Sequence, residues 1–129
     1  MPLTTRPTAL AALAAVPLTL VPAALLTASP AAADVERRDV CGRAVLELNV
    51  DRERGWEVDA DLDAAPGSRW TITLSQDGRT YYRQTRTADR EGELDVDTRR
   101  GDSAGRDTFR ATATPVGGGA ACSVTISVR

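Results

Sequence analysis

The most regular feature of the chain is an alternation of apolar and polar side chains with a period of two. It is clearest near the end, where the apolar positions are Phe109, Ala111, Ala113, Cys122, Val124, Ile126 and Val128. Thr, Ser and Arg fill the positions between them, and this pattern predicts two strands, over 107–114 and 122–128, that each bury one face. Pro115 and the glycines at 117–119 predict the turn that joins them.

The same alternation recurs earlier in the chain. It predicts five further strands, over 41–51, 56–63, 70–75 and 80–87 and a short one at 94–96. Asp77-Gly78 is the strongest hairpin signal, because this pair readily takes the positive φ angles of a type I′ turn. Residues 34–40 are charged without an apolar alternation, so we expect a loose leader there. No segment after residue 33 has a helical period.

The first 33 residues differ in character from the rest. Arg6 is their only charged residue, residues 9–26 are mostly Ala, Leu, Val and Thr, and Ala31-Ala32-Ala33 meets the small-residue requirement of signal peptidase. We therefore predict a cleaved secretory signal peptide, with Asp34 as the mature N-terminus. A membrane-spanning helix is the alternative, but two prolines interrupt the apolar run and no basic cluster follows it directly.

The remaining residues, 34–129, have the length of one small domain. They carry 18 acidic residues and 15 arginines, with both signs interspersed and no lysine. Domains that bind nucleic acids are strongly basic with clustered cations, so we expect no nucleic-acid partner. A domain of this size buries only roughly 60–65% of the surface that its unfolded chain exposes, so its stability margin is thin.

Cys41 and Cys122 are the only cysteines, and in a secreted chain two cysteines most simply form one disulfide. Each stands at the start of its predicted strand. The starts of two antiparallel neighbours of about eight residues would lie roughly 25 Å apart. A disulfide needs Cα atoms about 4.4–6.8 Å apart. If the first and last strands are neighbours, we therefore expect them to run parallel.

Seven short strands with turns about every 8–12 residues are typical of an immunoglobulin-like sandwich. The segment G-R-D-T-F-R-A-T-A-T-P (105–115), followed by S-V-T-I-S-V, resembles the closing two strands of secreted bacterial immunoglobulin-like, fibronectin III-like or cadherin-like domains. This resemblance, over 105–129, implies an all-β, seven-stranded antiparallel immunoglobulin-like β-sandwich, with the first and last strands parallel and one disulfide. Pro115-Val116-Gly117 replaces the calcium-binding carboxylates of cadherin-like domains, so the resemblance implies no calcium site at that position.

Missing residue types limit the chemistry of the chain. There is no His, which removes Ser-His-Asp and Cys-His catalysis as well as His-ligated metals. There is no Lys for a Schiff base, and a disulfide would leave no free thiol. Paired carboxylates remain, as in glycosidases, but small sandwiches without a deep cleft rarely organise them. We therefore expect no enzyme, no catalytic residue and no cofactor.

Two predicted strands carry carboxylates at every second position: Asp59, Asp61 and Asp63 on one, and Glu93, Asp95 and Asp97 on the other. In an immunoglobulin-like sandwich these strands are neighbours, and like charges directly opposite are destabilising. A calcium ion would relieve the repulsion, but carboxylates spread along a ladder do not wrap an ion. A solvated face, with nearby arginines relieving the repulsion, is the favoured interpretation, and no metal site is expected.

A polar loop is predicted over 99–106. It contains Arg100-Gly101-Asp102, a tripeptide known from adhesion ligands, and Arg99-Arg100 would suit a trypsin-like protease. A plain polar turn is the simpler interpretation of this segment, and Arg99, Arg100 and Asp102 are the residues that an interaction loop would use. Among the aromatic residues, Trp70 is expected in the core, and Tyr81 and Tyr82 are expected to point to opposite faces.

Together these features predict a secreted, non-enzymatic module for extracellular binding or cell-surface association. Its partner would be an extracellular protein or a component of the cell envelope, and no span of the mature chain would cross a membrane. The alternative is a secreted protease inhibitor whose reactive site lies in the loop 99–106. An enzyme built on carboxylates is a third possibility.

Overall fold

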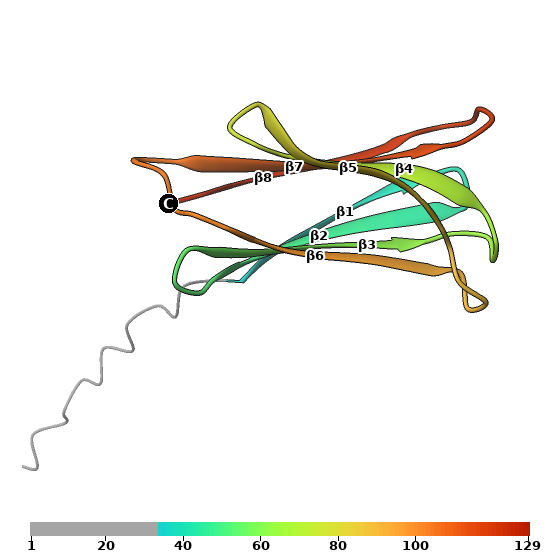
Figure 1. Cartoon of the computed structure of the whole chain (residues 1–129), viewed down its shortest axis with the longest axis horizontal. Helices are drawn as coiled ribbons and strands as arrows, with labels where there is room; N and C mark the ends of the chain where they lie inside the picture. Colours follow the sequence, from blue (N-terminus) through green and yellow to red (C-terminus); the bar gives the residue numbers. More distant parts are fainter. Residues whose placement is uncertain (1–33) are drawn as a thin grey trace, which may run out of the picture.

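The computed structural model describes residues 34–129, and all of its regular structure is β-strand. The eight strands are β1 (Val35–Cys41), β2 (Ala44–Arg52), β3 (Trp56–Asp63), β4 (Arg69–Gln76), β5 (Arg79–Thr87), β6 (Glu93–Arg100), β7 (Asp107–Pro115) and β8 (Cys122–Val128). They form two four-stranded sheets, ordered β1-β2-β3-β6 and β5-β4-β7-β8. Figure 1 shows these sheets as two stacked layers, so the predicted all-β sandwich is confirmed.

The apolar alternation predicted the core correctly. The inward residues of both sheets meet between the layers, and the largest fully buried side chains include Phe109, Leu46, Leu48, Leu62, Ile72 and Leu74. Trp56 meets Phe109 edge to face, with ring centroids 6.2 Å apart, an arrangement that stabilises beyond the area it buries. Trp70 is also buried, as expected, and its indole N–H donates to Ser68 Oγ at 2.9 Å.

The prediction of a loose leader at 34–40 is wrong. Residues 35–41 form β1, which pairs with β2 from Val35 opposite Val50 to Cys41 opposite Ala44. The sandwich therefore has eight strands where seven were predicted. β1 lies at the edge of its sheet and most of its side chains are exposed. Even the inward residues Arg37 and Asp39 are exposed or half-buried, so charged side chains are tolerated there and the apolar alternation of a strand packed on the core is absent.

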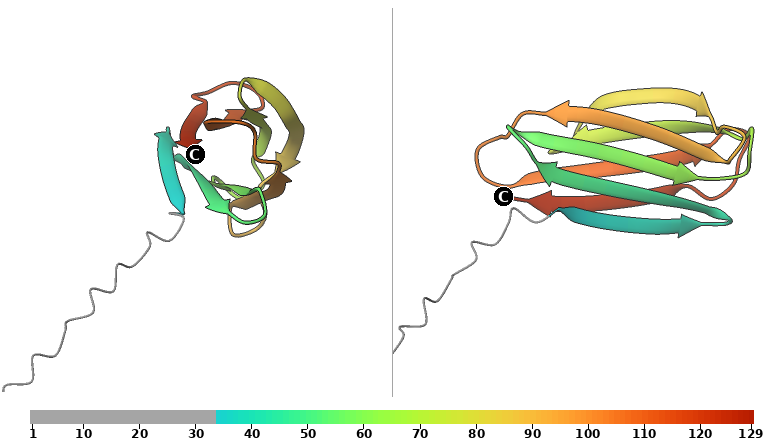
Figure 2. Two further views of the ribbon diagram at one scale, coloured as in Figure 1. Left: turned by 90° about the vertical axis from the view of Figure 1, so that its left-hand side faces the viewer. Right: turned by 90° about the horizontal axis from the view of Figure 1, so that it is seen from below.

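The extra strand changes the role of Cys41, which ends β1 instead of starting a strand. The predicted disulfide is present and joins Cys41 to Cys122 at the start of β8, with Cα atoms 5.1 Å apart. β2 begins just after Cys41 and runs in the same direction as β8 (Figure 2). However, all pairings among the described strands are antiparallel and none joins β8 to β1 or β2. The strand predicted first, now β2, therefore runs parallel to the last strand as expected, but the two share no backbone ladder, and the actual first strand, β1, runs in the opposite direction.

A side-chain contact supplements the disulfide between β1 and β8. Asp39 Oδ2 accepts a hydrogen bond of 3.0 Å from the backbone N–H of Ser123. Asp39 occupies an inward position of β1, where it pairs with Leu46 of β2, and its side chain is half-buried. The two edge strands are thus held together by one covalent bond and one hydrogen bond, without a backbone ladder.

The hairpin between β4 and β5 forms as predicted, with positive φ angles of 50° at Asp77 and 80° at Gly78. The strand register shifts between Leu74 and Ser75. Such a bulge places an extra residue on one strand and changes which side chains face inward. Tyr81 and Tyr82 consequently both pack against the core, which corrects the expectation that they point to opposite faces.

Two sequence-based predictions concern membranes and export. Between residues 34 and 129, no helix is long and apolar enough to cross a membrane. The predicted signal peptide, 1–33, lies outside the described residues. Cleavage before Asp34 therefore stays a prediction.

We expect the disulfide to contribute a large share of the stability. Replacing both cysteines, Cys41→Ala with Cys122→Ala, should cost roughly 2–5 kcal/mol, because the bridge constrains the unfolded chain over most of its length. This corresponds to a fall of more than about 10 °C in melting temperature for a small domain. Thermal melts with and without reductant, after thiol titration, measure the effect. Identical melts after verified complete reduction would contradict it.

Candidate functional site

Three connections meet at one end of the sandwich: the β2–β3 turn, the β4–β5 hairpin and the loop 101–106 between β6 and β7 (Figure 1, left). Beneath them lies Asp107, the only charged or polar residue that is buried in the described part of the chain. Its Oδ2 accepts hydrogen bonds from Trp56 Nε1 at 2.8 Å and from the backbone N–H of Ser103 at 3.1 Å. Its Oδ1 accepts from Gln76 Nε2 at 2.9 Å and from Ser103 Oγ.

These hydrogen bonds decide the charge of Asp107. Burial by itself would raise its pKa, but the donors on Ser103, Gln76 and Trp56 favour the ionised form and hold the pKa well below its usual range. Asp107 is therefore a carboxylate throughout the physiological pH range. Since the donors belong to β3, β4 and the loop, one buried charge ties three segments together.

The loop 101–106 is attached to its neighbours at further points. Ser103 Oγ also donates to Asp77 Oδ2 at 3.2 Å, and Gln76 Nε2 donates to the backbone oxygen of Gly101 at 2.8 Å. Arg52 forms an ion pair of 2.7 Å with Asp102 Oδ2. Every residue from 101 to 106 is nevertheless exposed. The loop therefore combines a defined shape with an accessible surface.

The structure separates the three predicted interaction residues. Arg99 and Arg100 belong to β6, so they point to opposite faces, and the loop begins only at Gly101. Arg99 is 74% exposed and lies 3.8 Å from Glu53 Oε2. Asp102 alone of the three lies in the loop, where it is paired with Arg52.

Arg100 is engaged within the molecule. Its guanidinium lies 4.1 Å from the centroid of the Tyr81 ring, and its Nε donates to Gln76 Oε1 at 3.0 Å. To act as an adhesion residue, or to enter the primary pocket of a protease, Arg100 would have to leave both partners. Arg106 is the one arginine that lies within the loop itself.

Asp107, the anchor of this site, was not among the predicted residues. Asp107 has the same strand parity as Phe109, Ala111 and Ala113, and this parity places it on the inward side of β7. An acidic residue at an inward position of a strand is unusual, because a buried charge must be hydrogen-bonded. An acidic residue with the parity of the apolar residues of its strand was therefore the signal in the sequence that Asp107 is buried and hydrogen-bonded. Two of the donors, Trp56 and Gln76, could not be identified from the sequence, because they lie 51 and 31 residues away.

A second notable surface is the outward side of the sheet β1-β2-β3-β6. As predicted, β3 and β6 are neighbours, and their carboxylates stand directly opposite one another: Asp59 with Asp97, Asp61 with Asp95, and Asp63 with Glu93. The outward carboxylates continue across the sheet with Glu57 on β3, Glu47 and Asp51 on β2, and Glu36 on β1. We call these ten residues the acidic face.

Among the described residues, the expected relief by arginines does not take the form of ion pairs where the charges are densest. Arg38 contacts Glu36 at 2.9 Å and Glu47 at 2.8 Å. Within residues 34–129, no ion pair reaches the six carboxylates of the β3–β6 ladder. No group of His, Cys, Asp or Glu arranged to hold a metal ion is found in the same part of the chain.

The crowding of the acidic face changes its titration. Partial burial, followed by the charge of Asp97, raises the pKa of Asp59 to about 6. Partial burial and the charge of Asp95 likewise raise the pKa of Asp61 to about 6. Asp59 Oδ1 is covered and has no hydrogen-bond partner. The acidic face thus carries a cost at neutral pH that protonation relieves.

The chain was also compared with known proteins. No protein-family model matches it, and no curated protein or solved structure matches it. The geometry of the molecule itself therefore carries the functional argument.

We expect Asp107→Asn to destabilise the protein by roughly 2–3 kcal/mol, because it removes charge-assisted hydrogen bonds and turns an amide N–H₂ towards donors. Urea unfolding at neutral pH measures the change. Asp102→Asn is the matched control at the exposed end of the same loop, and it should change stability by no more than about 0.5 kcal/mol. Equal losses in the two variants would show that Asp107 is not the anchor.

A second prediction concerns pH. The folded-state pKa values of Asp59 and Asp61, about 6, lie above the ordinary value, so the folded protein takes up protons that the unfolded chain does not. Stability should therefore rise as the pH falls through 6, with a gain of roughly 2–6 °C in melting temperature between about pH 7.5 and 5. The chain has no His to titrate in this interval.

The matched variant is Asp59→Asn with Asp61→Asn. It should melt higher than the wild type at about pH 7.5 and show a flatter pH profile, because the costly charges are gone. A wild-type melting temperature that falls between about pH 7.5 and 5 would contradict the assignment.

Proposed function

We propose that the protein is a secreted, non-enzymatic extracellular binding module that contacts its partner through the loop 101–106. The observation that carries this proposal is the buried Asp107, whose hydrogen bonds hold an exposed loop in one shape. A buried charge is a poor source of stability compared with apolar packing. A preorganised loop, in contrast, loses little conformational entropy when it binds. The arrangement is better suited to recognition than to stability.

The chemistry around the loop favours a polar partner. A shallow hollow beside it is lined by Gln76, Asp77, Arg79, Arg100 and the loop residues 101–103. Small-molecule sites are usually deep and lined mostly by apolar side chains, whereas polar and charged side chains line this hollow. The exposed charges of Arg79, Arg106 and Asp102 suit the polar surface of an extracellular protein or a cell-envelope component.

Two further features support the remaining parts of the proposal. The disulfide supports an extracellular location, because disulfides persist in oxidising compartments. Without β1, a three-stranded sheet, β2-β3-β6, faces the four-stranded sheet β5-β4-β7-β8. The chain crosses from one sheet to the other three times, after β3, after β5 and after β6. This two-sheet arrangement supports an immunoglobulin-like assignment.

The test is a binding experiment in which residues 34–129 are immobilised. Secreted proteins and cell-envelope fractions of the organism that makes the protein are passed over them, and bound partners are captured by cross-linking. The variant Asp102→Ala with Arg106→Ala should weaken capture of the partner by at least about tenfold, as expected for central contacts. Arg90→Ala with Glu91→Ala is the matched control, because it removes one charge of each sign from the opposite end of the sandwich. The control should bind as the wild type does.

Unchanged binding by the loop variant would overturn the proposal, as would the absence of any partner for the wild type. The protease-inhibitor alternative is tested with the same proteins. Inhibition of a trypsin-like protease by the wild type, lost on Arg106→Ala alone, would replace the proposed function with that alternative.

A further inference from the structure

The outward side of the sheet β5-β4-β7-β8 has the opposite chemistry from the acidic face. The outward positions of this sheet hold mostly Thr and Ser. Three arginines, Arg69, Arg83 and Arg110, lie among them. In the part of the chain that the structure describes, no carboxylate occupies an outward position of these four strands. We call this surface the hydroxyl–arginine face.

The cross-strand register arranges this face in rows. Thr73 stands between Arg83 and Thr112, and Thr112 stands next to Ser123. In the next row Arg110 stands next to Ser75. Apart from the arginines the side chains are short, and a shallow hollow opens over Thr73, Thr112 and Arg110. The face is therefore low in relief, rich in hydrogen-bond donors and positively charged.

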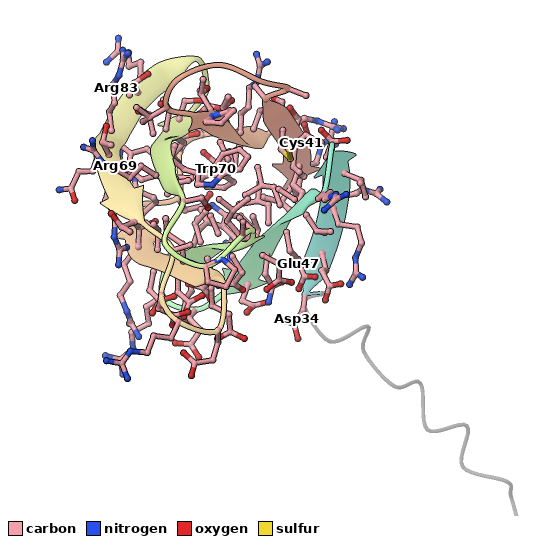
Figure 3. The ribbon with its side chains drawn as sticks, turned by 90° about the vertical axis from the view of Figure 1, so that its right-hand side faces the viewer. Asp34, Cys41, Glu47, Arg69, Trp70 and Arg83 are labelled. Carbon is pink, nitrogen blue, oxygen red and sulfur yellow. A yellow bond between two sulfur atoms is a disulfide. The ribbon has the colours of Figure 1, made fainter. Side chains whose placement is uncertain are left out.

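The two faces lie on opposite sides of one sandwich and cannot meet within a molecule (Figure 1). Figure 3 shows Arg69 and Arg83 on one side of the molecule and Glu47, a member of the acidic face, on another. Within the described strands, the acidic face carries ten carboxylates and two arginines, Arg38 and Arg99. The hydroxyl–arginine face carries three arginines and no carboxylate. Carboxylate oxygens accept hydrogen bonds, and guanidinium and hydroxyl groups donate them.

We propose that the acidic face of one molecule docks onto the hydroxyl–arginine face of a second copy. The argument is charge complementarity between two surfaces of the same chain, each of them four strands wide. The arginines of the partner would supply the countercharge that the β3–β6 ladder lacks within its own molecule. The contact joins different patches, so it is heterologous, and each added molecule leaves one free face of each kind.

The size of the faces sets the expected strength. Four strands of about eight residues cover roughly 20 Å by 25 Å, so docking would bury roughly 1,000 Å² in total. This lies at the lower limit for specific complexes, where transient contacts are found. The described residues place no aromatic side chain at an outward position of either face. The association should therefore be weak, salt-dependent and concentration-dependent.

The experiment is sedimentation velocity of the mature chain between about 20 µM and about 1 mM, in about 20 mM and about 500 mM NaCl at neutral pH. At low salt the weight-average mass should rise to at least about 1.5 times that of the monomer at the highest concentration, and high salt should abolish the rise. A wild type that stays monomeric at low salt overturns the proposal. Tight binding of inorganic polyphosphate by such a monomer would assign the hydroxyl–arginine face to a polyanion instead.

Two variants each disable one face. Arg83→Glu with Arg110→Glu reverses the hydroxyl–arginine face and keeps the acidic face. Asp61→Lys with Asp97→Lys disables the acidic face, and it places a cation opposite Asp95 and Asp59, which should favour folding. Each variant alone should remain monomeric at low salt, after circular dichroism melts confirm that it folds.

An equimolar mixture of the two variants should form a dimer and nothing larger, because it contains one complementary pair of faces. A mixture that remains monomeric while the wild type associates would overturn the proposal. Self-association of either variant alone would do the same, because it would show a contact that does not need both faces. The loop variant Asp102→Ala with Arg106→Ala should associate as the wild type does, which separates this proposal from the binding function of the loop.

Discussion

The packing of two apolar sheet faces against each other is the constraint on which the rest of this molecule depends. Alternate residues of β2, β3, β4, β6, β7 and β8 are committed to it, from Leu46 on β2 to Ile126 on β8. A strand that gives one face to the core presents its other face to solvent, and nothing in the core limits what that face carries. One sheet can therefore carry ten carboxylates and the other Thr, Ser and Arg, on the same buried framework.

Two additional interactions stabilise regions that this packing does not secure. At one end, the disulfide and the Asp39–Ser123 hydrogen bond join β1 to β8, which share no backbone ladder. At the other end, Asp107 organises the loop 101–106 through four hydrogen bonds. The first closes the open edge of a small sandwich. The second shapes an exposed surface, and for that reason we propose the loop as the place where a partner binds.

The β3–β6 ladder opposes the stability that the core provides. Asp59 and Asp61 face Asp97 and Asp95 directly, and the ion pairs of the described chain do not reach them. Protonation removes the repulsion at low pH, and a cationic surface would offset it at neutral pH. A feature that costs stability in the isolated molecule is better explained by an interaction with another one, and the hydroxyl–arginine face is a complementary surface that the chain itself supplies.

The sequence by itself determined the sandwich, its apolar core, the Asp77-Gly78 hairpin, the pairing of the cysteines and the opposed carboxylates, because all of these follow from a period of two, from turn chemistry or from there being only two cysteines. Tertiary structure alone decided the rest. β1 has no apolar alternation, because most of its side chains are exposed, and the bulge that turns Tyr81 and Tyr82 to the same side has no local signal. The anchor of the loop joins Asp107 to Trp56, 51 residues away, and Arg100 is withdrawn from the loop by Tyr81. Local patterns record which side of a strand is buried, whereas contacts between distant residues exist only once the sheets have packed.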